Sequence, residues 1–170
     1  MDLEREFGRA NANAPTELSR FAFLIGNWQC EARLLLPGGE RQVFPASWSG
    51  RYILDGYAIA DEYRMTGSSG ELIVYGLNFR SYEVGKRLWH IRWLNALAGN
   101  WVELASPELG GVRVSGRSVI YTFQEPVAGH TYTRATYTSV SSDRFTWLGE
   151  KSEDRTAWSE FMIVEARRSQ

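Results

Sequence analysis

Apolar side chains recur at every second position in several segments after residue 26. In the segment 87–95, Trp89, Ile91 and Trp93 alternate with a mixed set of polar and apolar residues. This spacing is typical of a β-strand with one buried face. Clusters of Gly, Pro, Ser, Asn and Asp interrupt the pattern roughly every 10 to 15 residues, as expected for strands joined by short turns. The sequence therefore predicts an all-β, antiparallel meander of about ten strands.

A sheet with this many strands needs closure, because each free edge exposes unpaired backbone hydrogen-bonding groups. The connections between the predicted strands are too short for a sandwich, so we expect an up-and-down barrel. A barrel of this strand number is wide enough to hold a small ligand. Within it, Asp55-Gly56 predicts a two-residue hairpin turn.

One short helix is predicted before the first strand. Leu18, Phe21 and Leu24 recur at helical spacing and share one helical face. Residues 1–14 are polar and rich in Asn and Ala, which indicates a flexible N-terminal segment. We therefore expect a single barrel domain over residues 15–170.

Residues 87–106 form a predicted hairpin whose register follows from the length of its loop. Asn95 lies opposite Asn100, so Arg92 opposes Glu103. One face is apolar and carries Trp89, Ile91, Trp93, Val102 and Leu104. The other face is mixed and carries Leu88, His90, Arg92, Leu94, Trp101, Glu103 and Ala105.

The mixed face has two interpretations, and the sequence leaves both open. If it coats the barrel, Arg92 and Glu103 form a surface ion pair worth at most about 1 kcal/mol. Leu88, Leu94 and Trp101 would then be exposed and would favour a partner. If it lines the barrel, the same polar groups orient a ligand inside an otherwise apolar wall.

Further candidate ligand-binding residues lie on other strands. Tyr and Trp side chains interleaved with isolated charges suit a pocket for a small molecule that is partly aromatic and partly polar. The full set of predicted ligand-binding residues is His90, Arg92, Glu103, Trp101, Tyr57, Asp61, Tyr63, Tyr132, Arg134 and Trp147.

Composition and charge narrow the function classes. The formal net charge is −1 with scattered basic residues, which argues against a nucleic-acid surface. A single cysteine and two distant histidines, His90 and His130, predict no metal site, and no motif predicts a cofactor. No signal peptide or membrane-spanning apolar run is visible, so we expect a cytoplasmic location.

The sequence "FLIGNWQ" contains Gly26-Asn27-Trp28, and this Gly-X-Trp motif resembles the start of the first strand in lipocalins and their calycin relatives. The segments "YILDGYAIADEY", "LWHIRWLNALAGNW" and "FTWLGEKSEDRTAW" are similar to those of a bacterial family of uncharacterised lipocalin-like proteins. The resemblance implies a barrel with a cavity, in which Trp28 closes one end and Arg167 or Arg168 packs over it. The chain departs from the family's "DGG-TW" turn, because residues 154–158 read DRTAW.

Together these features predict binding of a small, largely apolar or aromatic molecule in the barrel. One alternative is an enzyme that uses His90 or His130 as a general acid or base near neutral pH. Another is a protein-interaction module whose apolar outer strands form a homodimer.

Overall fold

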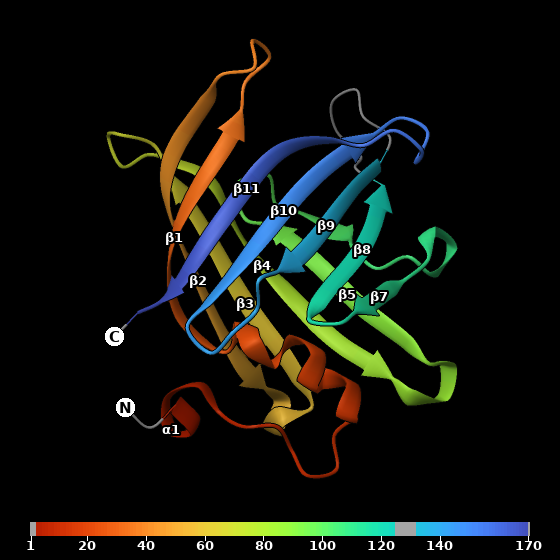
Figure 1. Cartoon of the computed structure of the whole chain (residues 1–170). Coiled ribbons are helices and arrows are strands. Elements are labelled where there is room, and N and C mark those ends of the chain that lie inside the picture. The colour runs from red at the N-terminus through yellow and green to blue at the C-terminus, as the bar shows by residue number, and fades with distance from the viewer. Residues whose placement is uncertain (1–2, 125–131, 170) are drawn as a thin grey trace.

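The computed structural model of the protein describes residues 3–124 and 132–169. Within these ranges, eleven strands form one antiparallel sheet that curls into a barrel, which confirms the predicted all-β fold (Figure 1). The strands are β1 (Gly26–Leu35), β2 (Arg41–Ile53), β3 (Ala58–Thr66), β4 (Leu72–Glu83), β5 (Leu88–Asn95), β6 (Asn100–Glu103), β7 (Val112–Ser115), β8 (Ser118–Gln124), β9 (Tyr132–Thr138), β10 (Arg144–Ser152) and β11 (Ser159–Arg168).

The order of strands in the sheet follows the chain, and the first and last strands are neighbours. Strand β1 pairs with β2 on one side and with β11 on the other, where Trp28 lies opposite Arg168. The two edges of the sheet are β6 and β7, which follow one another in the chain through a short 3-10 helix, η4 (Pro107–Leu109). The sheet is therefore continuous between the first and last strands and interrupted between β6 and β7.

Side chains alternate between the interior and the surface along the strands, as the period of a pleated sheet requires. In β9, Thr133, Ala135 and Tyr137 are buried, whereas the residues between them are half-buried. In β1, Trp28 and Cys30 are buried and the residues next to them are exposed. This alternation defines an inner set of side chains that fills the barrel.

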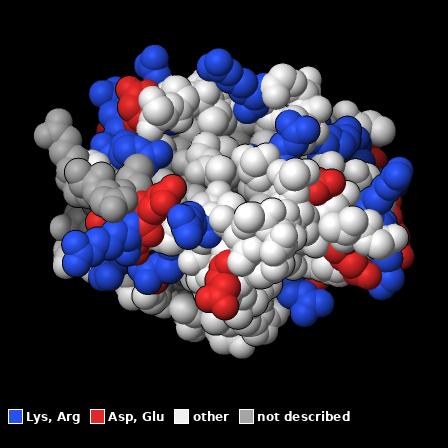
Figure 2. Space-filling model, turned by 90° about the horizontal axis from the view of Figure 1, so that it is seen from below, with Lys and Arg blue, Asp and Glu red and all other residues white. Residues whose placement is uncertain are grey.

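A 3-10 helix, η1 (Thr16–Leu24), covers the lower end of the barrel in Figure 1, and we call it the plug. Leu18, Phe21 and Leu24 are buried, which confirms the predicted apolar helix face, although the helix is of the 3-10 type. Seen from below, uncharged residues occupy the middle of this end and charged residues lie mostly around its margin (Figure 2). The plug thus closes this end with an apolar inner face.

The sequence predicts no element in residues 1–14, but the structure contains one there. An α-helix, α1 (Leu3–Phe7), precedes the plug, and Phe7 is buried. The backbone N–H of Asn11 donates to the carbonyl of Gly56 (3.2 Å), and the side-chain Nδ2 of Asn11 donates to the backbone carbonyl of Asp55 (3.0 Å). The segment therefore contacts the β2–β3 turn, while its flexibility and the boundary at residue 14 stay predictions.

The predicted two-residue turn at Asp55-Gly56 is wrong. Ile53 pairs with Ala58, so four residues connect β2 to β3. Leu54, Asp55 and Gly56 all have positive φ angles of 51°, 53° and 85°. The hydrogen bonds from the N-terminal segment hold this wider turn, and a local sequence pattern does not contain those distant contacts.

We expect the substitution Gly50→Ala to displace the plug. A Cβ atom at Gly50 would overlap the backbone carbonyl of Leu24, the last residue of the plug. The loss in free energy of unfolding should be about 1–3 kcal/mol, because backbone on both sides must shift to relieve the overlap. Urea denaturation measures the loss, with Gly85→Ala as the control, since a Cβ there has no neighbour within 4 Å. Equal losses in the two variants would contradict the close packing of the plug on β2.

Candidate functional site

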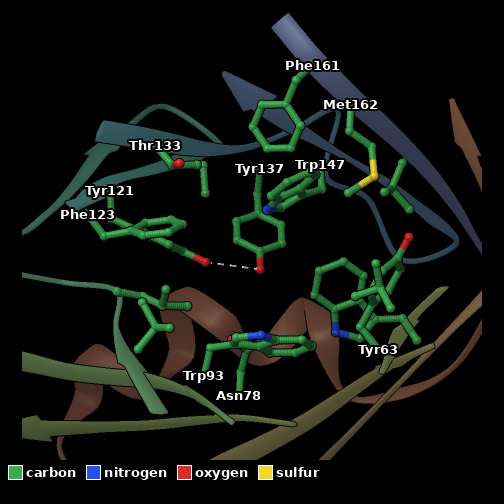
Figure 3. Close-up of a pocket in the computed structure, with 16 residues that line it drawn as sticks. Tyr63, Asn78, Trp93, Tyr121, Phe123, Thr133, Tyr137, Trp147, Phe161 and Met162 are labelled. Atoms are coloured by element: carbon green, nitrogen blue, oxygen red, sulfur yellow. Dashed lines mark hydrogen bonds between the residues drawn. The ribbon is translucent and has the colours of Figure 1, made fainter. Parts of the chain in front are cut away.

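The barrel contains a cavity of about 210 Å³ above the plug. Side chains from β2–β6 and β8–β11 converge on it, so nearly the whole sheet, except β1 and β7, contributes to its wall (Figure 3). The lining residues are Trp48, Tyr63, Val74, Asn78, Trp93, Val102, Leu104, Tyr121, Phe123, Thr133, Ala135, Tyr137, Trp147, Phe161, Met162 and Val164.

Aromatic rings form most of the wall. Figure 3 shows Trp93 on one side of the cavity and Trp147 with Phe161 on the opposite side. The rings of Trp147 and Phe161 pack edge to face, with centroids 6.1 Å apart. Such packing fixes ring orientation and leaves flat apolar surfaces toward the cavity.

A buried ion pair lies behind the wall, and neither Asp61 nor Arg80 has an exposed side chain. The Nε and Nη2 atoms of Arg80 donate to the carboxylate of Asp61 at 2.5 and 3.1 Å. Asp61 Oδ1 also accepts from Trp48 Nε1 (2.7 Å) and from Asn78 Nδ2 (2.9 Å). Four donated hydrogen bonds therefore offset the loss of water around this carboxylate.

The ion pair reaches the cavity through tyrosine hydroxyls. Arg80 Nη2 donates to Tyr137 Oη (2.9 Å), and Tyr137 Oη lies 3.4 Å from Tyr121 Oη. Both tyrosines line the cavity, and their hydroxyls point toward one another (Figure 3). Burial raises the pKa of Tyr137 well above its ordinary value, and the nearby positive charge of Arg80 opposes this only in part.

Arg80 remains charged in this environment. Burial by itself would lower the pKa of its guanidinium, but the charge of Asp61 and the tyrosine oxygens raise the pKa above its ordinary value. The guanidinium also lies over the ring of Phe21 from the plug, 4.5 Å from the centroid. The ion pair is thus held between the plug below and the cavity above.

Three of the predicted ligand-binding residues point into the barrel. Tyr63 and Trp147 line the cavity, and Asp61 lies behind its wall in the ion pair. The hydroxyl of Tyr63 is buried without a hydrogen-bond partner among the described residues, and burial raises its pKa.

The mixed face of the hairpin coats the barrel, so the interpretation in which it lines the cavity is wrong. The predicted register is correct, with Asn95 opposite Asn100 and Arg92 opposite Glu103. The Arg92 and Glu103 side chains pair at 2.8 Å but are 60% and 42% exposed, and Trp101 is 55% exposed. The outward orientation keeps both charges hydrated, while the apolar face supplies lining residues to the cavity.

His90 belongs to the same outer face. Its Nε2 lies 3.0 Å from the carboxylate of Glu83 on the neighbouring strand, and both side chains are partly exposed. His90 therefore lies outside the cavity. The other histidine, His130, falls outside the described residues.

The remaining candidates also lie on the outside. Tyr57 is 44% exposed at the β2–β3 turn. Arg134 pairs with Glu150 at 2.8 Å and lies over the ring of Trp158, and Tyr132 lies beneath Arg155. Tyr132 and Arg134 alternate in β9 with the residues that line the cavity, so their side chains face away from it.

Several residues of the cavity wall and of the ion pair are not among the predicted ligand-binding residues. Tyr121 and Tyr137 fall on the same alternating positions as the buried apolar residues of their strands, and the sequence shows this alternation. Arg80 follows directly after the segment 71–79, which the sequence predicts as a strand, whereas β4 continues to Glu83. The pairing of β3 with β4 places Asn78 opposite Asp61, and only this register brings Asp61, Asn78 and Arg80 together.

The end of the barrel near the plug has the arrangement that the Gly-X-Trp resemblance implies. Trp28 is buried, and its Nε1 donates to the carbonyl of Leu24 (3.0 Å). Of the two candidate basic residues, Arg168 lies over the Trp28 ring, 4.1 Å from its centroid, and donates to the carbonyl of Ile25 (2.8 Å). This contact ties the last strand to the chain between the plug and the first strand.

Residues 3–124 and 132–169 contain no group of three His, Cys, Asp or Glu side chains arranged to hold a metal ion. In the same ranges, no helix has the length and apolar character needed to cross a bilayer.

Comparison with known proteins gives structural likeness only. No family model and no curated protein matches the sequence. The chain is similar in structure to Rv2717c from M. tuberculosis, with a TM-score of 0.60 and 10% identity, covering 93% of this chain and 100% of that one. It is also similar to two barrels solved with bound DFHBI: the redesigned β-barrel mFAP0 (TM-score 0.41, 14% identity) and EF1p2_mFAP2b (0.43, 16%), covering 86% and 89% of this chain and 99% of each of those. The likeness to Rv2717c shows the barrel fold.

We expect Asp61→Ala to destabilise the barrel strongly. The substitution leaves the Arg80 guanidinium buried without its counter-charge, which costs about 3–5 kcal/mol in other buried pairs. Glu103→Ala is the matched control, because it breaks an exposed pair worth at most about 1 kcal/mol. Chemical denaturation at neutral pH measures both, and similar losses would show that the two pairs contribute alike.

Proposed function

We propose that the barrel binds one small, flat and largely apolar molecule in its cavity. The observation that carries this proposal is the cavity itself, about 210 Å³ in volume and walled mainly by aromatic and aliphatic side chains. An apolar cavity of roughly 150 Å³ in another protein holds benzene, whereas pockets for larger ligands start near 300 Å³. The volume therefore favours a molecule of one or two rings.

The wall favours an aromatic ligand over an aliphatic one. Trp93 and Trp147 lie on opposite sides of the cavity and offer flat surfaces between which a ring can pack (Figure 3). Ring pairs in stacked or edge-to-face geometry contribute roughly 0.5–1.5 kcal/mol beyond the burial of their area. The described residues supply few polar groups to the wall, chiefly Asn78 and the tyrosine hydroxyls.

We also propose that the chain is a lipocalin-like, calycin-type barrel. The support is the position of Trp28 in its Gly-X-Trp motif and the stacking of Arg168 on its ring. A cavity closed at one end by this pair is the arrangement that the resemblance implies. The cytoplasmic location and the homodimer stay predictions, and the exposed Trp101 is the residue with which a dimer would be tested first.

Binding is favoured over acid–base catalysis by the position of the ionisable groups. Among the described residues, those that line the cavity include no His, Asp or Glu. His90 faces outward and pairs with Glu83, so it does not reach a molecule in the cavity. A catalytic role for His130 stays a prediction.

Filling the cavity should abolish binding. Naphthalene is a suitable probe because it is apolar, flat and composed of two rings. We expect calorimetric titration to show binding to the wild-type protein and none to Ala135→Phe, because Ala135 lines the cavity and the new ring occupies the ligand's volume.

Thr136→Phe is the matched control, since Thr136 adjoins Ala135 in β9 but belongs to the outward-facing set. It should bind naphthalene as the wild type does. Absence of binding to the wild-type protein would overturn the proposed function. Equal binding to Ala135→Phe and the wild type would place the molecule elsewhere.

A further inference from the structure

Hydrogen bonds connect Arg80 to Tyr137 and Tyr137 to Tyr121, and they limit where each hydroxyl hydrogen can point. A guanidinium only donates, so Tyr137 Oη must accept from Arg80 Nη2. The hydroxyl hydrogen of Tyr137 therefore points away from Arg80. It either donates to Tyr121 Oη or enters the cavity.

In both arrangements one hydroxyl hydrogen has no acceptor. If Tyr137 donates to Tyr121, the hydrogen of Tyr121 is left over, and if Tyr121 donates to Tyr137, the hydrogen of Tyr137 is left over. No other described residue is hydrogen-bonded to either hydroxyl. The two oxygens lie within the cavity wall, so the unused donor faces the space that a ligand would occupy (Figure 3).

The surroundings keep the hydroxyl of Tyr137 protonated and polarise the donor. Tyr137 is fully buried, and burial raises its pKa well above the ordinary value, so it does not ionise at neutral pH. The positive guanidinium behind its oxygen withdraws electron density, and hydrogen bonds in such chains strengthen one another. A buried donor left unpaired costs free energy, which an acceptor on the ligand removes.

The charges near the tyrosines disfavour an anionic ligand. The charge of Arg80 is already balanced by Asp61, whose carboxylate accepts two of its hydrogen bonds. Tyr137 also lies between the guanidinium and the cavity. A carboxylate placed against the hydroxyls would lose its water without gaining a free counter-charge, and this is costly.

We infer that the molecule bound in the cavity is uncharged and carries a hydrogen-bond acceptor, of the carbonyl class, that accepts from the Tyr121–Tyr137 hydroxyl pair. This inference rests on the proposed function and adds the chemistry of the ligand's polar end. The ring system packs between the tryptophans, and the carbonyl oxygen lies against the two hydroxyls.

Three naphthalene derivatives of similar shape test the inference. 2-Acetylnaphthalene carries a ketone, 2-isopropenylnaphthalene replaces its oxygen with a methylene group, and 2-naphthoate replaces the ketone with a carboxylate. We expect the ketone to bind roughly fivefold tighter than the alkene, as one added hydrogen bond provides. We expect the carboxylate to bind at least about tenfold more weakly than the ketone.

The preference should depend on the two hydroxyls together. Each single variant, Tyr121→Phe or Tyr137→Phe, retains one hydroxyl hydrogen and should keep part of the preference. The double variant should lower the ketone-to-alkene affinity ratio to about one. Tyr132→Phe is the matched control, because this tyrosine lies on the outer face of β9 and its loss should leave the ratio unchanged.

The carbonyl stretching frequency of the bound ketone gives a readout that needs no variant. With a ¹³C-labelled carbonyl, infrared spectroscopy of the wild-type complex should show a shift to lower frequency relative to the ketone in alkane solvent. An unshifted band would overturn the inference even if the double variant fails to fold.

The outcomes separate the inference from the proposed function. If none of the three molecules binds, the proposed function fails, and the inference fails with it. If alkene and ketone bind equally, or if the carboxylate binds tightest, the cavity binds ligands but the inferred chemistry is wrong.

Discussion

The buried ion pair between Asp61 and Arg80 is the constraint on which the interior depends. Two opposite charges without contact to water require many hydrogen bonds from fixed directions. Besides the bonds within the pair, Trp48 of β2 and Asn78 of β4 donate to Asp61, and Tyr137 of β9 accepts from Arg80. Among the described residues, Nη1 of Arg80 is buried without a hydrogen-bond partner. A change of strand register that moved another partner would leave a second unsatisfied bond on a buried charge, so the pair specifies how β2, β3, β4 and β9 face one another.

The same pair divides the barrel into two parts with different packing. Below it, Phe21 of the plug covers the guanidinium and packs edge to face on Trp89, with centroids 4.9 Å apart. Above it, the hydroxyls of Tyr121 and Tyr137 open into the cavity. A buried ion pair contributes little net stability compared with well-packed apolar residues. Its main effect here is to fix the positions of the side chains around it. It fixes the boundary between a filled end and a hollow end.

The strands and the hairpin register could be predicted from the sequence because both follow from short-range rules. Alternation and turn residues locate the strands, and loop length places Arg92 opposite Glu103. Which face of a strand lines the barrel could not be predicted from period alone, because both faces of the hairpin contain large apolar residues. Asp61 is among the predicted ligand-binding residues, but its partner Arg80 lies beyond the predicted end of its strand, and their contact depends on the pairing of β3 with β4.

High aromatic content by itself does not indicate a ligand, because aromatic residues build both ends of this barrel. In the filled end, Phe21, Trp28 and Phe145 pack edge to face on neighbouring rings, with centroids 4.9 to 5.5 Å apart. In the hollow end, Trp93 and Trp147 are held apart on opposite sides of the cavity. Close packing is the favourable state of aromatic side chains, and a cavity lined by them forfeits dispersion contacts. The case for a ligand therefore lies in the separation of these rings and in the unused hydroxyl hydrogen beside them, since a flat molecule with a carbonyl oxygen restores both kinds of contact at once.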